Sequence, residues 1–452
     1  MSGRRGRGGA RRRPRARIPS PPPGFVFPDV PDELLLMIFD HLKRSELVRL
    51  ARVCRTWTRV ARERLFSDVR IKPYDDIVPV QLPQARARQR EEEKIAFVAS
   101  DDVAHCLRHF HMSGPDPGRS KRPYRGGDEV HALLHAAFRA VPNMTRLVSL
   151  HIKSVPLTAT ALEALASLTS TKLSLFVNNC SILEPLPPTA RIPAAELDVQ
   201  FGLVGLCQWL QLIDPATLRK VTVYQLPTVS GTTSPFANVE ELVLDAHPDL
   251  AVVGRLFPNL ANLNFYKQFS SLYPPQITAT PFPKLQRLEA AISTFPLLAA
   301  GTSLKEFVMK FSAGSESVHA EMQKVPAAAE TLITLSLHLI DTAYFAHIMA
   351  LVPNLRKLVL KADGNVYMIE EPLTLLASLK NTLPRALHTL DVRLGSGNGK
   401  LLPGIAFLPG TTTVDPRIPD AEALRVELRE RCPGIVKASV RASFFALDWV
   451  KG

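Results

Sequence analysis

The sequence predicts a mixed α/β protein in which a short three-helix segment precedes a long solenoid, or horseshoe, of strand-containing repeats. The first observation is the spacing of apolar residues at steps of three and four between residues 28 and 70, which is typical of helices. The second is an apolar Leu-x-x-Leu-x-Leu pattern that recurs from residue 128 onward at intervals of roughly 20 to 30 residues. One such repeat cannot bury its own apolar face, so neighbouring repeats are expected to stack on a shared core.

The composition is that of a globular chain suited to a reducing compartment. Of the 452 residues, 46% are hydrophobic and 21% are charged, which supports a substantial core. No apolar run reaches the roughly 18 to 20 residues of a membrane helix, and the N-terminus lacks the apolar region of a secretory signal. The five cysteines show no paired spacing. We therefore expect a location in the nucleus, the cytoplasm or both, with no membrane contact.

The positive charge is concentrated at the N-terminus. The net charge is +13, and the first twenty residues hold eight arginines and no acid, so only +5 (13 minus 8) remains for the rest of the chain. Residues 1–27 are rich in Arg, Gly and Pro and have little to bury, so they are expected to be disordered. Three interpretations stay open for this tail: a solvated extension, a nuclear-import signal, or an Arg-Gly segment that makes weak nucleic-acid contacts.

Residues 28–70 form the predicted three-helix segment. Pro31, followed by two acids, suits the first turn of a helix, and Ser45 suits the N-cap of a second one. The six residues 34–39 are all apolar and cover every face of the first helix. A three-helix core of about forty residues cannot hide them all. Either some of them are exposed at an interface, or the helices belong to a larger domain that buries the excess.

This segment resembles an F-box. The motif hydrophobic-Pro-x-Glu-Leu-Leu, then Ile-Phe, a Leu, a polar-Leu step and Val-Cys-Arg-x-Trp is matched in order by Val30, Pro31, Glu33, Leu34, Leu35, Ile38, Phe39, Leu42, Glu46, Leu47, Leu50, Val53, Cys54, Arg55 and Trp57. Val30 stands where Leu is common in the family, and Glu46 where Asp is common. The resemblance implies docking on the Skp adaptor of cullin–RING ubiquitin ligases. It also implies that the adaptor is contacted by Pro31, Leu34, Leu35, Ile38, Phe39, Leu42, Leu47, Val53 and Trp57.

Residues 71–127 are expected to form a partly helical connecting region. The stretch 84–94 is polar with a helical pattern, and 113–127 is a loop by its Gly, Pro and charge content. His105 and His109 have the i, i+4 spacing of metal ligands on a helix. No second set of ligands accompanies them, so a polar helix face is favoured, and no metal or other cofactor is expected.

Residues 128–452 contain the repeats. The pattern occurs at 146–152, 171–177, 194–200, 217–223, 238–244, 258–265, 283–290, 303–309, 331–337, 353–360, 386–392 and 434–440. The first apolar residues of the expected strands are Leu150, Leu173, Leu197, Val221, Leu242, Leu263, Leu288, Phe307, Leu335, Leu358 and Leu390. The pattern is similar to irregular leucine-rich repeats, although the Asn that usually follows the strand occurs only as Asn178. An ordinary α/β domain with many amphipathic strands is the alternative.

In such a coil, the residues that alternate with the strand apolars face the concave surface. These positions mix aromatic, amide and charged side chains of both signs, as a protein-binding face does. The residues predicted to bind a protein substrate are Tyr224, Asn262, Asn264, Tyr266, His338, Lys361 and Arg393. An ordinary solvated sheet face is the alternative for each of them.

Enzyme signatures are missing: the chain has no GxSxG, HExxH or CxxC motif, and no catalytic residue is predicted. The F-box resemblance implies a substrate-recognition subunit of a Skp–cullin–F-box ubiquitin ligase. In that function, the first helices bind the adaptor and the repeats bind an unknown protein target. The alternative is a nuclear RNA-associated repeat scaffold that uses the Arg/Gly tail, with purely structural F-box-like helices.

Overall fold

The computed structural model describes residues 30–72, 85–114, 127–183, 191–200, 206–223, 234–244, 250–266, 282–362, 370–394, 420–442 and 445–450. The chain divides into two compact units, residues 1–65 and residues 66–452. The expected α/β architecture is confirmed, with helices in the first unit and a sheet of parallel repeats in the second. No helix in the described ranges is long and apolar enough to cross a membrane.

The described part of the first unit contains α1 (Asp32–Phe39), α2 (Arg44–Leu50) and α3 (Arg55–Leu65). Its core is formed by the buried residues Leu35, Phe39, Leu47, Val60, Ala61 and Leu65. The ring of Phe39 meets that of Trp57 edge-on, with the centroids 5.9 Å apart, so α1 and α3 pack through aromatic contact.

Charged side chains reinforce the ends of these helices. Asp32 in the first turn of α1 pairs with Arg59 of α3, and Asp40 pairs with Arg64 at 2.7 Å. The predicted cap at Ser45 is wrong, because α2 already begins at Arg44. The carboxylate of Glu46 accepts a hydrogen bond from the Lys43 backbone N–H at 2.7 Å, which satisfies the free amide at that end.

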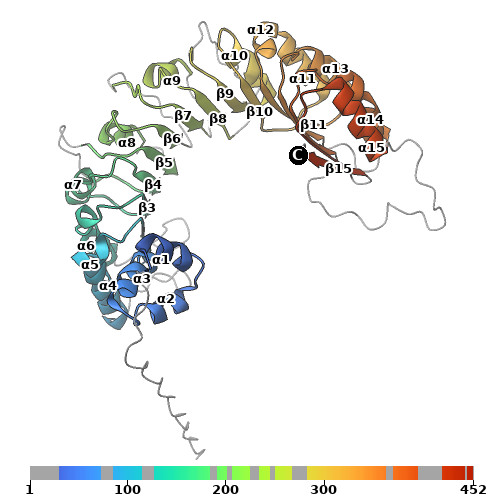
Figure 1. The fold of residues 1–452 in the computed structure, drawn as a ribbon. Helices are drawn as coiled ribbons and strands as arrows, with labels where there is room; N and C mark the ends of the chain where they lie inside the picture. The colour runs from blue at the N-terminus through green and yellow to red at the C-terminus, as the bar shows by residue number, and fades with distance from the viewer. Residues whose placement is uncertain are drawn as a thin grey trace, which may run out of the picture. The chain divides into compact units, whose positions relative to one another are not determined.

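The second unit contains one sheet whose strands follow the order of the chain, and Figure 1 shows helices along one side of that sheet. Its described strands are β1 (Asp68–Ile71), β2 (His109–Ser113), β3 (Ser149–Lys153), β4 (Ser174–Asn178), β5 (Glu196–Gln200), β6 (Lys220–Val223), β7 (Glu241–Leu244), β8 (Asn262–Phe265), β9 (Arg287–Ala290), β10 (Glu306–Met309), β11 (Thr334–Leu339), β12 (Lys357–Ala362), β13 (Thr389–Leu394), β14 (Lys437–Ala442) and β15 (Phe445–Val450). All neighbouring pairs from β1 to β14 are parallel, and β15 is antiparallel to β14. Parallel neighbours need a return segment after each strand, which is the basis of the repeat.

The return segments are mostly helical. Within the described ranges they include α4 (Ala85–Val98), α5 (Asp101–Ala104), α6 (Gly127–Phe138), η1 (Val141–Asn143), α7 (Ala159–Ala166), α8 (Leu206–Leu212), α9 (Leu250–Leu256), η2 (Ile292–Thr294), α10 (Phe295–Ala299), α11 (Ser315–Gln323), α12 (Pro326–Glu330), α13 (Phe345–Ala350), α14 (Glu370–Thr382) and α15 (Ala421–Arg431). Their length varies from repeat to repeat, as expected of an irregular repeat protein.

A single apolar ladder runs across the repeats. Strand residues alternate between buried and outward positions, and one buried position is in register from β3 to β13. It is occupied by Leu150, Leu175, Leu197, Val221, Leu242, Leu263, Leu288, Phe307, Leu335, Leu358 and Leu390. The predicted alignment is therefore right except at Leu173, which precedes β4. Leu175 takes its place, because Leu173 and Leu175 alternate with Ser174 and either of them fits the apolar pattern of the segment.

Side-chain hydrogen bonds join successive repeats just before the strands. Asn238, Asn259 and Asn354 each donate an amide N–H to a backbone carbonyl of the preceding repeat, at 3.0, 2.8 and 3.0 Å. Thr217 and Thr331 occupy the corresponding position and donate their hydroxyls in the same way. This position lies four residues before the ladder residue, so the two near-identical segments around Asn259 and Asn354 share a structural function.

The sheet begins earlier than the repeat pattern indicates. β1 ends at the first residue of the expected connecting region of 71–127, and β2 lies inside it, so this region contributes to the sheet and to the core. His105 follows α5 and His109 begins β2, so they do not share a helix face. In the described part of the chain, no group of three or more His, Cys, Asp or Glu residues could hold a metal ion.

Candidate functional site

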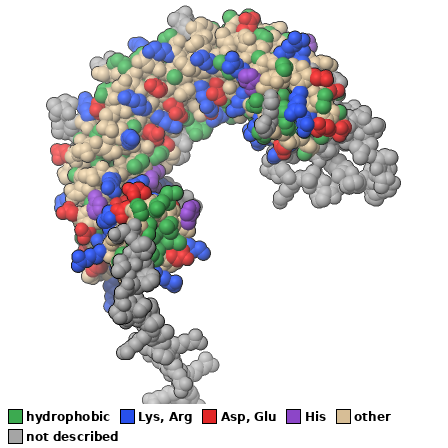
Figure 2. Space-filling model, viewed as in Figure 1, with side chains coloured by type: hydrophobic (Ala, Val, Ile, Leu, Met, Phe, Trp, Pro, Cys, Tyr) green, Lys and Arg blue, Asp and Glu red, His purple; other side chains and the backbone are tan. Residues whose placement is uncertain are grey.

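The helical unit has an exposed apolar face. α1 places Leu34, Met37 and Ile38 at i, i+3 and i+4, and these side chains are 50%, 64% and 53% exposed. Val48 on α2 and Val53 in the turn after it are also exposed. Figure 2 shows hydrophobic side chains gathered on this unit. We call these five residues the apolar patch. A concentration of large exposed apolar side chains on so small a unit is typical of an interaction surface.

The predicted adaptor-binding residues fall into three groups in the structure. Leu34, Ile38 and Val53 are in the apolar patch, and Pro31 is exposed next to it in sequence. Leu42 and Trp57 are partly buried. Leu35, Phe39 and Leu47 are at most 6% exposed and form the core, so they offer a partner almost no surface.

The sequence analysis did not single out two members of the apolar patch, Met37 and Val48. The sequence could have indicated Met37 as a candidate for exposure, because the run 34–39 has more apolar residues than one buried face of a helix needs. Deciding which of the six are exposed required the packing of α3 against α1.

The outward face of the sheet is the second candidate surface, and its N-terminal strands carry a stack of rings. His111 of β2 and His151 of β3 lie parallel with centroids 4.2 Å apart, and His151 stacks on Phe176 of β4 at 4.1 Å. Burial, and to a smaller extent the neighbouring His111, lower the pKa of His151 to about 4. Burial also lowers the pKa of His111, so both imidazoles are mainly neutral near pH 7 and stack without charge repulsion.

The basic residues on the outward face of the middle strands, β5 to β10, are paired with acids of the same face. Lys220 pairs with Glu241 across β6 and β7 at 2.7 Å, and this hydrogen bond raises the pKa of Lys220. Burial would raise the pKa of Glu289, but hydrogen bonds from Arg287 and Lys310 outweigh that effect and lower it. Lys310 also lies 4.8 Å above the ring centroid of Tyr266.

The predicted substrate-binding residues lie on this outward face where the structure describes them. Asn262 and Asn264 occupy outward positions on β8, and the Asn264 amide donates to Glu289 at 2.8 Å. Tyr266 follows β8 and is 51% exposed. His338, Lys361 and Arg393 are register partners on three neighbouring strands, β11 to β13. Tyr224 lies outside the described residues.

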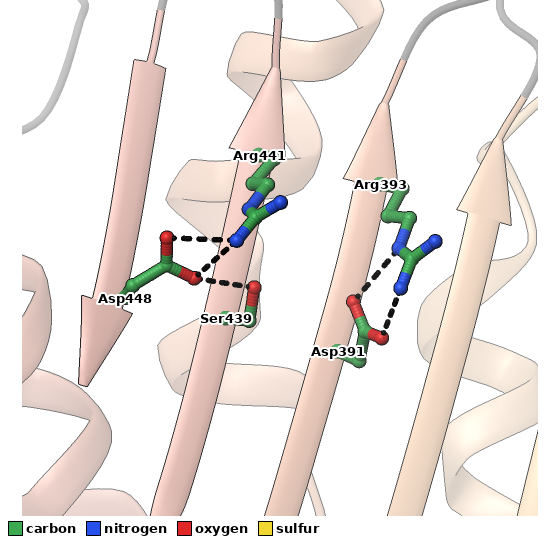
Figure 3. A network of polar contacts seen from close by, with 5 residues as sticks. All are labelled: Asp391, Arg393, Ser439, Arg441 and Asp448. Carbon is green, nitrogen blue, oxygen red and sulfur yellow. Dashed lines mark hydrogen bonds and ion pairs between the residues drawn. The ribbon is translucent and has the colours of Figure 1, made fainter. Parts of the chain in front are cut away.

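The C-terminal strands are the most basic part of the face. Arg393 binds the carboxylate of Asp391 through two nitrogens, at 3.2 and 3.0 Å, on the same strand β13. On β14, Arg441 binds both oxygens of Asp448 on β15, and Ser439 donates to the same carboxylate at 2.7 Å (Figure 3). Sequence reasoning did not single out Arg441, because the antiparallel strand that brings Asp448 beside it has no repeat signature.

These features define a two-part protein with a small helical unit that exposes an apolar patch and a leucine-rich-repeat-like sheet. Residues 27–72 match the F-box-like family model, which agrees with the motif found in the sequence. No curated protein sequence matches the chain significantly.

Several solved structures resemble the chain in fold. One is the yeast complex of Rad7 and Elc1, at 12% identity and a TM-score of 0.32, covering 82% of this chain and 91% of that one. Another is an internalin from Listeria monocytogenes, at 12% identity and a TM-score of 0.30, covering 75% and 92%. A third is a leucine-rich-repeat protein from Leptospira interrogans, at 14% identity and a TM-score of 0.28, covering 74% and 85%. These likenesses are weak, and the repeat architecture of this chain is defined by its own strand order and register.

Proposed function

We propose that this protein is the substrate-recognition subunit of a Skp–cullin–F-box ubiquitin ligase. The helical unit would bind the Skp adaptor, and the outward face of the sheet would bind the protein target. The chain itself would carry out no chemistry. Its contribution would be proximity, because holding a target lysine near a ubiquitin-loaded enzyme raises the effective concentration of the two reactants.

The apolar patch, located within the F-box-like match, is the observation that carries this proposal. In the isolated chain, five large apolar side chains of the helical unit remain between 41% and 64% exposed. Complete burial of one such side chain is worth about 1.5–3 kcal/mol. Since roughly half of each is still exposed, docking could gain about 1 kcal/mol for each of them before the costs of association.

The test is co-purification of the full chain with a Skp adaptor. The variant Leu34→Asp with Ile38→Asp puts two charges into the patch and leaves the buried core residues in place. We expect it to lose the adaptor while the helices stay folded. The matched control is Leu183→Asp with Ile340→Asp, which changes two apolar residues of similar exposure, 61% and 54%, in the second unit.

The two variants should differ in how well they bind the adaptor. The control should retain the adaptor as well as the unmodified chain does. A chain that fails to bind the adaptor at all, or a patch variant that still co-purifies with it, would show that the F-box-like helices are only structural.

A further inference from the structure

The outward face of β12 to β15 carries a surplus of positive charge. Its outward positions hold Lys357, Lys361, Arg393, Lys437 and Arg441 against the two carboxylates of Asp391 and Asp448, a net charge of +3. Three of these cations are register partners on neighbouring strands: Lys361 pairs with Arg393, and Arg393 with Arg441. We call these three residues the basic row.

The middle strands of the sheet face, β5 to β10, offer an anion fewer cations than β12 to β15 do. The outward positions of β5 to β10 hold five acids, Glu196, Asp198, Glu241, Glu289 and Glu306, against the two bases Lys220 and Arg287. Both bases form ion pairs with these acids. In contrast, Lys357 and Lys361 form no ion pair with any described residue. An anionic partner would therefore be attracted to the C-terminal strands.

The geometry of the basic row leaves its cations accessible. The side chains of Arg393 and Arg441 are 59% and 62% exposed. Figure 3 shows that each guanidinium is held on one side by a carboxylate of the sheet. Asp391 and Asp448 lie in a separate register row, two residues from the basic row. They fix the guanidinium planes and use only part of the five N–H donors of each arginine.

The arrangement of charges selects among anionic partners. Sites for single-stranded nucleic acid usually place base-stacking aromatic side chains between the cations, and the described outward positions of β12 to β15 hold none. Asp391 and Asp448 would also repel regularly spaced phosphates. A peptide that crosses the strands along the basic row avoids both carboxylates. Neighbouring strands are about 4.8 Å apart, so the row spans roughly 10 Å, which is the length of about four consecutive residues of an extended peptide.

We propose that the basic row is a docking site for an extended, Asp/Glu-rich segment of a partner protein. Carboxylates of that segment would bind Lys361 and the outward donors of Arg393 and Arg441. This inference deepens the proposed function, on which it rests, by assigning the chemical class of the target segment and the strands that bind it.

The test measures binding of a fluorescent peptide of alternating Glu and Gly to the full chain by anisotropy. A peptide of about ten residues is long enough to cross the basic row. We expect saturable binding that weakens as salt is raised. The variant Lys361→Glu with Arg393→Glu should weaken binding at least about tenfold. The matched control, Arg255→Glu with Lys324→Glu, makes the same change of charge on α9 and just after α11 and should leave binding nearly unchanged.

Several results would overturn the proposal. These are an absence of peptide binding, an equal loss in the control variant, or selective binding of a phosphoserine-Gly peptide or of single-stranded RNA in place of the Glu-Gly peptide. Adaptor co-purification separates this proposal from the proposed function. The Lys361→Glu, Arg393→Glu variant should still bind the adaptor, and the Leu34→Asp, Ile38→Asp variant should still bind the peptide.

Discussion

Leu35 and Ile38 lie three residues apart on α1, but Leu35 belongs to the core of the helical unit and Ile38 to its exposed apolar patch. Leu35 is 2% exposed, and Ile38 is 53% exposed. Truncating a buried leucine to alanine costs about 3–5 kcal/mol, so Leu35→Ala should destabilise the helical unit strongly. Truncating the half-exposed Ile38 should change stability by no more than about 0.5 kcal/mol. It should cost about 1 kcal/mol of adaptor binding, which is roughly a fivefold rise in Kd.

Hydrogen exchange and an adaptor titration separate the two effects in the full chain. Leu35→Ala should lower amide protection in α1, α2 and α3 by roughly 100-fold or more. Ile38→Ala should leave that protection intact and change only the adaptor Kd. The reasoning is refuted if the two variants behave alike, or if Ile38→Ala loses protection while retaining full adaptor affinity.

Three further predictions concern the second unit. Asn354→Ala removes the side-chain hydrogen bond to the Glu330 carbonyl and should lower the unfolding free energy by about 1 kcal/mol, measured by denaturant titration against the exposed-site variant Lys324→Ala. Burial raises the pKa of the Cys180 and Cys432 thiols to about 11. Both thiols should therefore react with a thiol reagent at pH 8 far more slowly than the partly exposed Cys54. Rapid labelling of Cys432 in the folded chain would contradict this prediction. Burial lowers the pKa of His151 from 6.5 to about 4, so this residue binds a proton in the unfolded chain at a higher pH than in the folded chain. The free energy of unfolding should therefore decrease as the pH falls from about 6.5 to about 4. A His151→Asn variant should lose less stability across that interval.

The repeat architecture could be predicted because its physical cause is local and periodic. Each repeat must supply one apolar residue to the shared ladder, so residues such as Leu335, Leu358 and Leu390 recur at similar intervals and are visible in the sequence. The strands β1, β2 and β15 could not be found in this way. β1 and β2 contain Arg70, His109 and His111 at outward positions and lack the Leu-x-x-Leu-x-Leu pattern. β15 runs antiparallel and is fixed only by its pairing with β14.

The candidate sites were less predictable, because they depend on contacts between residues that are far apart in the sequence. The F-box resemblance located the helical unit, but the division of the run 34–39 into core and surface depends on how α1 packs against α3. On the sheet, the sequence indicated which residues face outward, because alternation along a strand fixes that. It did not indicate which charges are neutralised. The pairing of Lys220 with Glu241 and the isolation of Lys361 arise from the neighbours that register brings together.

The separation between ladder and outward face has a consequence for specificity. A substitution at an outward position such as Lys361 removes no atoms from the core, whereas one at Leu358 or Leu360 opens a cavity in it. The outward positions can therefore differ from strand to strand without loss of the fold. Along this sheet they form a ring stack on β2 to β4, bases paired with a surplus of acids on β5 to β10, and a surplus of cations on β12 to β14. Since rim charges mainly steer association and exclude wrong partners, reversing the charge of the basic row should change which peptides bind and leave the unfolding free energy close to that of the unmodified chain.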